Sequence, residues 1–228
     1  MPTDTTDTVD SARRPLTRER VLEGAIGLAD RIGIQPLTIR KLADELGTKP
    51  MTIYHHVENK DAILDGMVDA VFAEIDLPPS ELDWKQAIRA RCLSARAVLS
   101  RHSWATPLME SRTTPGRATL RHHDAVIATF LRGGMSMATA AHAYAIVDSY
   151  VYGFALQEAT LVTDAEMELT DVAEAILASP EMEEFPDFAA FTVHHVLQPG
   201  YDFGSSFEIG LDLLLDGLEA MVDEQASD

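Results

Sequence analysis

The chain lacks the features that would place it outside the globular proteins of the cytosol. Its 228 residues include a single cysteine, Cys92, so it can form no internal disulfide and no thiolate cage for a metal. No apolar run approaches the roughly 18 residues that a membrane-spanning helix needs. The opening MPTDTTDTVDSARRP has no apolar segment of the kind found in secretory signals. The simplest interpretation is a cytosolic protein that does not contact membranes.

Motifs of the common enzyme classes are also missing. The sequence contains no HExxH, CxxC or GxSxG pattern, no phosphate-binding loop and no dinucleotide fingerprint. Histidine pairs occur at 55–56, 122–123 and 194–195. Neighbouring residues on a helix point about 100° apart, so such a pair cannot share one metal ion. We therefore expect no catalysis, no metal and no cofactor.

Basic residues are absent from the C-terminal part of the chain. Residues 133–228 hold 19 acids and no lysine or arginine, so the net charge of −19 belongs to this part. Residues 13–60 hold nine bases and six acids. Such asymmetry is typical of a protein with one nucleic-acid-facing end. For residues 133–228 we favour the alternative that the acidic surface only maintains solubility.

Apolar residues recur at three- and four-residue spacing along most of the chain, which predicts an all-α protein. Residues 1–14 are polar and are interpreted as a flexible arm. Thr17, Thr38 and Asn59 are expected to cap helices, while Gly33 and Gly47 are expected to end them. The longer helices are expected at 17–32, 59–76, 83–99, within 113–134, and at 136–160, 164–178 and 207–222. Loops are expected at 179–187 and 198–206, where proline, glycine and serine gather.

Two short helices joined by a turn at Gly47 match the plan of a helix-turn-helix. The first is apolar on one face, and the second, over 48–57, turns Ile53 and Val57 inward. A major groove admits one such helix when a preceding helix braces it. The pattern predicts an N-terminal DNA-binding domain over 15–62 and a larger helical domain for ligand binding and dimerisation over 63–228.

The sequence LTIRKLADELGTKPMTIYHHVENKDAIL, residues 37–64, resembles the tetracycline-repressor (TetR) family of bacterial regulators. The run from Thr52 to Val57, followed by Asn59 and Lys60, is similar to the family's recognition helix and the start of its fourth helix. A weaker likeness to the tetracycline repressor's own core lies in the FEIGL and GLE segments of the last helix, residues 207–211 and 217–219.

The resemblance implies roles for residues of the reading head. Arg40 occupies the place of a base-reading arginine, the commonest side chain to contact guanine. Pro50 replaces a hydrogen-bonding residue, which implies an altered base preference. Tyr54, His55 and Lys60 match phosphate-contacting positions, although packing remains an alternative for Tyr54, as does a solvated charge for Lys60. The full set of expected DNA-binding residues is Thr38, Arg40, Thr48, Lys49, Pro50, Met51, Thr52, Tyr54, His55 and Lys60.

The last helix has two apolar faces, which favours a homodimer. One stripe is expected to consist of Phe207, Leu211, Leu214, Leu218 and Met221. Gly210, Leu213 and Gly217 form a second face, where small residues allow another helix to approach. A helix that is apolar all round is either deeply buried or shared with a partner. A monomer with one large core is the alternative.

The resemblance also implies a ligand pocket within 76–160. The places of two drug-contacting histidines, one of them a magnesium ligand, hold Met109 and Asp76, which disfavours a tetracycline–magnesium ligand. A mostly apolar pocket with a polar anchor is expected instead. Its expected residues are Arg91, Trp104, Met109, Arg112, Phe130, Tyr144 and Tyr152. For each aromatic residue, ordinary core packing is an equal alternative.

These observations predict a ligand-responsive regulator, most simply a repressor. A homodimer would bind double-stranded, palindromic operator DNA, and a small-molecule effector of unknown identity would release it by shifting the helix at 59–76. The alternative from a different class is an all-helical small-molecule binding protein without sequence-specific DNA binding.

Overall fold

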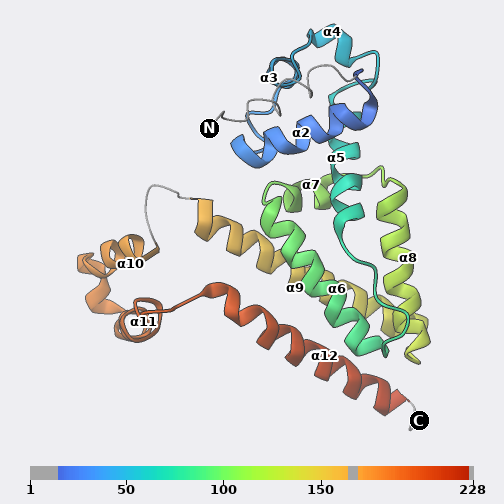
Figure 1. The fold of residues 1–228 in the computed structure, drawn as a ribbon. Coiled ribbons are helices and arrows are strands. Elements are labelled where there is room, and N and C mark those ends of the chain that lie inside the picture. Colours follow the sequence, from blue (N-terminus) through green and yellow to red (C-terminus); the bar gives the residue numbers. More distant parts are fainter. Residues whose placement is uncertain (1–14, 164–168, 226–228) are drawn as a thin grey trace, which may run out of the picture. The chain divides into compact units, whose positions relative to one another are not determined.

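The computed structural model describes residues 15–163 and 169–225, and the chain divides into two compact units, 1–145 and 146–228. The described residues form helices and contain no strand, so the all-α prediction is confirmed (Figure 1). The expected arm at 1–14 lies outside the described residues. The first unit contains α2 (Arg18–Ile32), α3 (Ile39–Glu45), α4 (Pro50–Ile53), α5 (Lys60–Glu74), α6 (Trp84–Arg101), α7 (Ala105–Ser111), α8 (Arg117–Arg132) and the start of α9 (Met137–Thr163).

Side-chain caps define where these helices begin. Thr17, Thr38 and Asn59 accept hydrogen bonds from the backbone N–H three residues later, as predicted, and Asp83 does the same for α6. Each cap satisfies a donor that has no partner inside the helix. Gly33, which follows α2, has a φ of 75°, a value that glycine adopts without strain.

Helix α5 lies at the centre of the first unit. It packs against α2, α6, α7 and α8 (Figure 1). Its buried residues do not fall on one stripe: Ile63, Met67 and Val71 are fully buried, and Val68 and Phe72 are nearly so. A helix that is covered on several sides cannot move without disturbing each of its neighbours. This position makes α5 the mechanical link between the N-terminal helices and the remainder of the unit.

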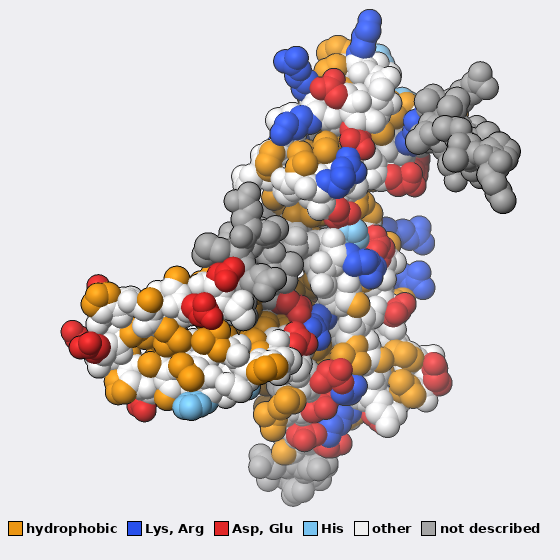
Figure 2. All heavy atoms as spheres, turned by 60° about the vertical axis from the view of Figure 1, so that its left-hand side comes forward, with side chains coloured by type: hydrophobic (Ala, Val, Ile, Leu, Met, Phe, Trp, Pro, Cys, Tyr) orange, Lys and Arg blue, Asp and Glu red, His pale blue; other side chains and the backbone are white. Residues whose placement is uncertain are grey.

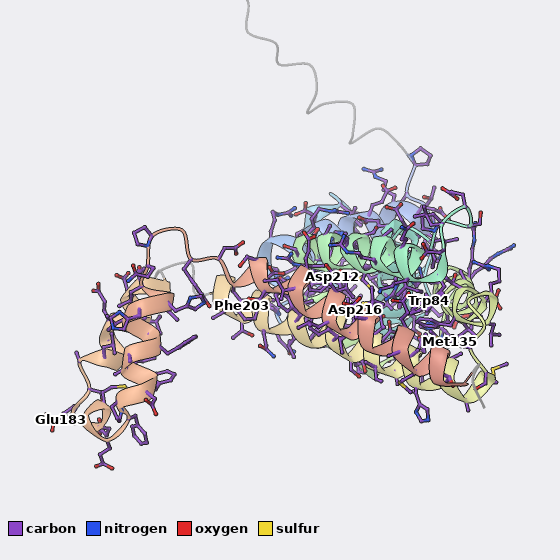
Figure 3. The ribbon with its side chains drawn as sticks, turned by 90° about the horizontal axis from the view of Figure 1, so that it is seen from below. Trp84, Met135, Glu183, Phe203, Asp212 and Asp216 are labelled. Atoms are coloured by element: carbon purple, nitrogen blue, oxygen red, sulfur yellow. The ribbon has the colours of Figure 1, made fainter. Side chains whose placement is uncertain are left out.

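The turn after α8 is shaped by a close approach of an aromatic ring. A side chain at Gly133 would overlap with the indole of Trp84, which begins α6. Trp84 also packs against Phe130, with 6.1 Å between the ring centroids. Trp84 and the buried Met135 lie at the same end of this unit (Figure 3). The turn therefore needs glycine because the ring occupies the space of a Cβ.

The second unit contains the remainder of α9 and several shorter elements. These are α10 (Leu169–Leu177), η2 (Pro180–Glu184), α11 (Pro186–Phe191), η3 (Thr192–Val196), η4 (Phe203–Ser205) and α12 (Ser206–Gln225). The prediction of a loop over 179–187 was wrong, since Pro180 and Pro186 each stand in the first turn of a helix, where proline is tolerated. The loop predicted at 198–206 holds a short 3₁₀ turn, and part of the helix predicted at 164–178 lies outside the described residues.

Aromatic rings hold α9 against the start of α12. Phe154 stacks on Phe203 at a centroid distance of 4.7 Å, and Tyr150 stacks on Phe207 at 5.4 Å (Figure 3 labels Phe203). The Tyr150 hydroxyl also donates a hydrogen bond to the Phe207 carbonyl at 2.9 Å. A side chain at Gly210 would collide with the Tyr150 hydroxyl. Gly210 therefore serves contact within the chain, whereas no atom lies within 4 Å of a Cβ built at Gly217.

The buried stripe of α12 differs from the prediction at two positions. Phe207, Leu211 and Leu218 are buried as expected, but Leu215 is buried in place of Leu214, and Met221 is 39% exposed because the stripe ends before the last turn of the helix. On another face, Ile209 and Leu213 are 65% and 68% exposed. Within the described ranges, no helix combines the length and the apolar character that crossing a bilayer requires.

The N-terminus of α8 yields a prediction about stability. Asp69 of α5 accepts hydrogen bonds from the Thr119 N–H and hydroxyl, at 2.8 and 2.9 Å, and a side chain at Gly116 would displace this carboxylate. Gly116→Ala should lower the free energy of unfolding by about 1–2 kcal/mol, the usual effect of a lost helix cap. Denaturant unfolding followed by circular dichroism measures this change.

The matched control is Gly27→Ala. Gly27 lies inside α2, and the nearest atom to a Cβ built there is 3.8 Å away. This substitution should leave stability unchanged or raise it by up to about 1 kcal/mol. Equal effects of the two substitutions would contradict the role given to Asp69.

Candidate nucleic-acid interface and effector core

Helices α3 and α4 form the reading head, which we define as residues 38–57. Thr38 caps α3 by accepting from the Lys41 N–H at 3.2 Å. Gly47, with a φ of 62°, reverses the chain, and the Thr48 N–H then donates to the Ala43 carbonyl at 2.9 Å. Ile53 and Val57 are buried, as predicted. The turn is therefore fixed by backbone hydrogen bonds, and the apolar side of α4 is fixed by burial.

The recognition helix is shorter than predicted. Helix α4 ends at Ile53, and Tyr54 follows as its C-cap. The N–H groups of His55 and His56 donate to carbonyls three residues back, at 3.2 and 2.9 Å. Bonds of this spacing tighten the last turn of a helix, so the segment expected to be helical as far as Val57 continues as tighter turns.

The outward face of the reading head carries cations and apolar groups. The side chains of Arg40 and Lys49 are exposed, and neither side chain forms a hydrogen bond or ion pair with the residues that the structure describes. Met51 is 69% exposed and Tyr54 41%, so neither serves as core. Lys and Arg side chains are visible at this tip in Figure 2. Unpaired cations beside exposed apolar groups match what phosphate and base edges require of a protein surface.

Lys60 has a structural contact that the sequence did not predict. Its ammonium donates to the Leu37 carbonyl at 2.8 Å, which ties the start of α5 to the residue immediately before the reading head. The ammonium has two further N–H groups, so this bond is compatible with the predicted phosphate contact. Lys60 therefore connects the reading head to α5.

Arg91 and His122 form a buried polar pair between α6 and α8. Both residues are fully buried, and the Arg91 Nε donates to the His122 Nε2 at 2.7 Å. This bond requires neutral imidazole with its proton on Nδ1. Burial, followed by the charges of Arg91 and His123, lowers the pKa of His122 to about 3. Among the described residues, the His122 Nδ1 has no hydrogen-bond partner.

Arg112, a predicted polar anchor of the pocket, is engaged with α5. Its Nε donates to Asp65 at 2.5 Å and its Nη1 to Asp61 at 3.1 Å. The hydrogen bond with Asp65 is the largest of the influences that raise the pKa of Arg112 above its ordinary value. Asp61, Asp65 and Asp69 stand four residues apart and share one face of α5. The structure thus places Arg112 as a link from α7 to α5.

Trp104 is also engaged with another helix. It is buried, and its Nε1 donates to Asp30 of α2 at 2.6 Å. His102 contacts the same aspartate through Nδ1 at 2.8 Å and approaches Glu74 of α5 through Nε2 at 3.2 Å. Partial burial works to raise the pKa of Glu74, but hydrogen bonds from Arg101 and His102 hold it below its ordinary value.

The remaining predicted pocket residues occupy varied surroundings. Phe130 is buried against Trp84. Tyr144 shares a hydrogen bond of 2.5 Å with His123 of α8, and Met109 is half-buried on α7. Tyr152 is buried in the second unit. Their roles in ligand binding stay predictions.

Two hollows lie within the second unit. One, of about 370 Å³, is lined by α9 residues from Ser149 to Gln157 together with Phe203 and Ser206. The other, of about 140 Å³, is apolar and lies among α10, α11 and η3. Neither lining includes a predicted pocket residue. Among the described residues, no group of three or more His, Cys, Asp or Glu is placed to hold a metal ion.

Comparison with known families covers nearly all of the described chain. Residues 21–67 match the bacterial regulatory proteins of the tetR family, and residues 77–222 match the tetracyclin repressor-like C-terminal domain. The chain belongs to the TetR family. Within this family the N-terminal match contains the whole reading head.

The chain is similar to individual TetR relatives from Saccharopolyspora and Streptomyces. An HTH-type transcriptional regulator of Saccharopolyspora erythraea is 36% identical over 139 residues, which are 60% of this chain and 59% of that protein. The HTH-type transcriptional repressor DrrR1 of Streptomyces coeruleorubidus is 32% identical, over 93% of this chain and 83% of that one. The Streptomyces coelicolor TetR family protein ActR, solved in complex with actinorhodin, is 26% identical with a TM-score of 0.71, over 92% of this chain and 99% of that one.

Sequence reasoning missed several residues that organise this TetR chain. His122 could have been found, because it repeats at helical spacing with Thr119, Val126 and Phe130, all of which are buried. The partners of His102 carry no such signal. Asp30 and Glu74 lie 72 and 28 residues from it in the sequence.

The neutral state of His122 predicts a pH dependence of stability. In the unfolded chain an ordinary histidine gains its proton near pH 6.5, whereas the folded chain resists protonation until about pH 3. The unfolded state therefore binds more protons between these values, and the free energy of unfolding should fall by about 1.4 kcal/mol per pH unit as pH decreases.

His122→Gln should remove this contribution, because the amide oxygen can accept from Arg91 but does not titrate. The exposed His194→Gln is the control and should keep the wild-type slope. Denaturant unfolding at several pH values between 4 and 7 provides the measurement. Parallel slopes for wild type and His122→Gln would show that folding does not lower the pKa of His122.

Proposed function

We propose that the chain is a ligand-responsive transcriptional repressor that binds a palindromic operator as a homodimer. The observation that carries this proposal is the reading head. It presents the side chains of Arg40 and Lys49, which have no partner within residues 15–163 and 169–225, beside exposed Met51 and Tyr54. Membership of the TetR family and the likeness to the repressor DrrR1 support the same function. A small-molecule binding protein without DNA binding is not favoured, because it leaves this exposed face without a role.

The exposed face of α12 supports a homodimer. Ile209 and Leu213 lie one turn apart and are largely exposed, and Gly217 follows one further turn on with open space around it. Such a face is suited to helix–helix contact with a second copy. Two heads related by two-fold symmetry would read half-sites about 34–36 Å apart.

Helix α5 provides the route from an effector to the DNA. It begins at Lys60, which binds Leu37 beside the reading head, and its aspartates hold Arg112 and the N-terminus of α8. An effector that displaces α7 or α8 would pull on these carboxylates and tilt α5. The effector then lowers operator affinity by as much as it prefers the tilted state.

Two observations bear on the chemical class of the effector: the residues in the core of the first unit and the ligand of the similar protein ActR. The core holds aromatic and apolar residues with the Arg91–His122 pair, and Met109 stands where the resemblance implies a metal-binding histidine. The similar protein ActR was solved in complex with actinorhodin, which supports a small organic molecule as effector. An aromatic, metal-free effector is the class we propose.

Selection of bound sequences from random duplex DNA tests operator binding. The full-length protein should enrich a palindromic site. Arg40→Ala should then weaken binding to that site by about 1–3 kcal/mol and relax preference at one base position, as expected for an arginine that reads guanine. Lys49→Ala should weaken binding to all sequences and reduce the salt dependence by about one counterion.

Arg117→Ala is the matched control, because Arg117 is an exposed arginine of α8 outside the reading head. It should leave operator affinity unchanged. Absence of any enriched sequence, or equal losses for Arg40→Ala and Arg117→Ala, would refute the proposed function.

Arg112→Gln distinguishes two roles for Arg112: joining α7 to α5, or binding the effector in the pocket. Compounds that release the wild type from its operator are first identified by screening. If Arg112 links α7 to α5, the variant should bind these compounds with unchanged affinity, yet need roughly tenfold more of them for release, because the coupling is weakened. Calorimetry and operator titration measure the two quantities. Loss of compound binding itself would instead assign Arg112 to the pocket.

A further inference from the structure

His102 lies where three helices meet. It caps the end of α6, with its N–H donating to the Val98 carbonyl, and its side chain is 8% exposed. Its ring reaches Asp30 of α2 on one side and Glu74 of α5 on the other. Helix α2 packs on α3 as well as on α5 (Figure 1). A bond to Asp30 therefore restrains the helix on which the reading head rests.

The geometry requires the imidazole to carry two protons. The His102 Nδ1 is 2.8 Å from Asp30 Oδ1, and its Nε2 is 3.2 and 3.3 Å from the two oxygens of Glu74. Ionised carboxylates only accept hydrogen bonds, so each ring nitrogen must donate. A neutral imidazole donates from one nitrogen alone. Loss of one proton therefore breaks one of the two contacts.

The other polar groups at this site support the same arrangement. The charged groups that face His102 are Asp30 from α2 and Glu74 from α5, and Arg101 from α6 binds Glu74 at 2.8 Å. Trp104 donates to the same oxygen of Asp30 that His102 contacts. This indole bond persists whatever the charge of His102, so it keeps Asp30 in position when the imidazole becomes neutral.

We propose that His102 is a positioning residue for DNA binding, and that it clasps α2 to α5 only when its ring is doubly protonated. We call the Asp30–His102–Glu74 contact the clasp. A closed clasp holds the reading head in one orientation, which reduces the freedom lost when two heads bind one operator. Operator affinity is then linked to the uptake of a proton by the imidazole of His102. This inference rests on the proposed function.

The test compares operator affinity at pH 6, 7 and 8 and constant ionic strength for the full-length protein, using the sequence obtained by selection. In the wild type, affinity should fall by roughly five- to tenfold as pH rises, the size of a modest coupling between sites. His102→Gln can donate to only one carboxylate, so its affinity should be low at every pH and should depend less on pH.

Two further variants separate the clasp from other titrating groups. Asp30→Asn keeps an oxygen that accepts from Trp104 but removes the charge, so it should also flatten the profile. His194→Gln, at an exposed position of the second unit, should keep the wild-type profile. The two histidines of the reading head are present in all these variants, so they contribute no difference between the profiles. Parallel profiles for wild type and His102→Gln, or a wild-type affinity that rises with pH relative to the variant, would overturn the proposal.

A measurement without DNA keeps the test decisive if no operator is found. Denaturant unfolding of wild type, His102→Gln, Asp30→Asn and the double variant forms a double-mutant cycle. The coupling between the two residues should be larger at pH 6 than at pH 8, because a charged imidazole binds the Asp30 carboxylate more strongly than a neutral one. A coupling that is absent at pH 6, or equal at both pH values, refutes the clasp. Failure of DNA selection alone refutes the proposed function instead.

Discussion

The carboxylates of α5 are the interaction on which the first unit depends. Asp61, Asp65 and Asp69 recur every four residues, so they project from one face of the helix. Two of them hold the guanidinium of Arg112, and the third caps α8. On a different face of α5, Ile63, Met67 and Val71 are fully buried. Their burial fixes the rotation of the helix about its own axis. Together these constraints allow α5 few positions, which is what a helix needs if it is to transmit a displacement rather than absorb it.

The reading head has an inner side that is fixed by packing and an outer side that is exposed. Its inner side is fixed by apolar burial and by a short backbone-bonded turn. On its outer side, the side chains of Arg40 and Lys49 have no partner among the described residues. Exposed side chains such as these contribute little to the free energy of folding. We expect the partners of Arg40 and Lys49 to be groups of the DNA. The surplus positive charge of residues 13–60 stands in contrast to the acidic residues that follow. Because phosphates repel the acidic part, the protein can approach DNA productively only with its head.

The second unit combines tight internal contacts with apolar exposure. Rings of Tyr150, Phe154, Phe203 and Phe207 join α9 to the start of α12, and this packing explains why Gly210 has no side chain. On the same helix, Ile209 and Leu213 remain exposed. Glycines seven residues apart, at 210 and 217, thus serve different purposes. One accommodates a ring from the same chain, and the other lies on a surface open to a partner.

The sequence by itself determined the helical fold, the caps at Thr17, Thr38 and Asn59, the buried side of α4 and the family, because these depend on local spacing and on short-range hydrogen bonds. It could not give the shortened recognition helix or the helices begun by Pro180 and Pro186, since local propensities there are weak and nearly balanced. Nor could it reveal that Arg112 binds Asp65 or that His102 joins Asp30 to Glu74. Those contacts connect residues 28 to 72 positions apart, and only the packing of whole helices decides which charged groups meet.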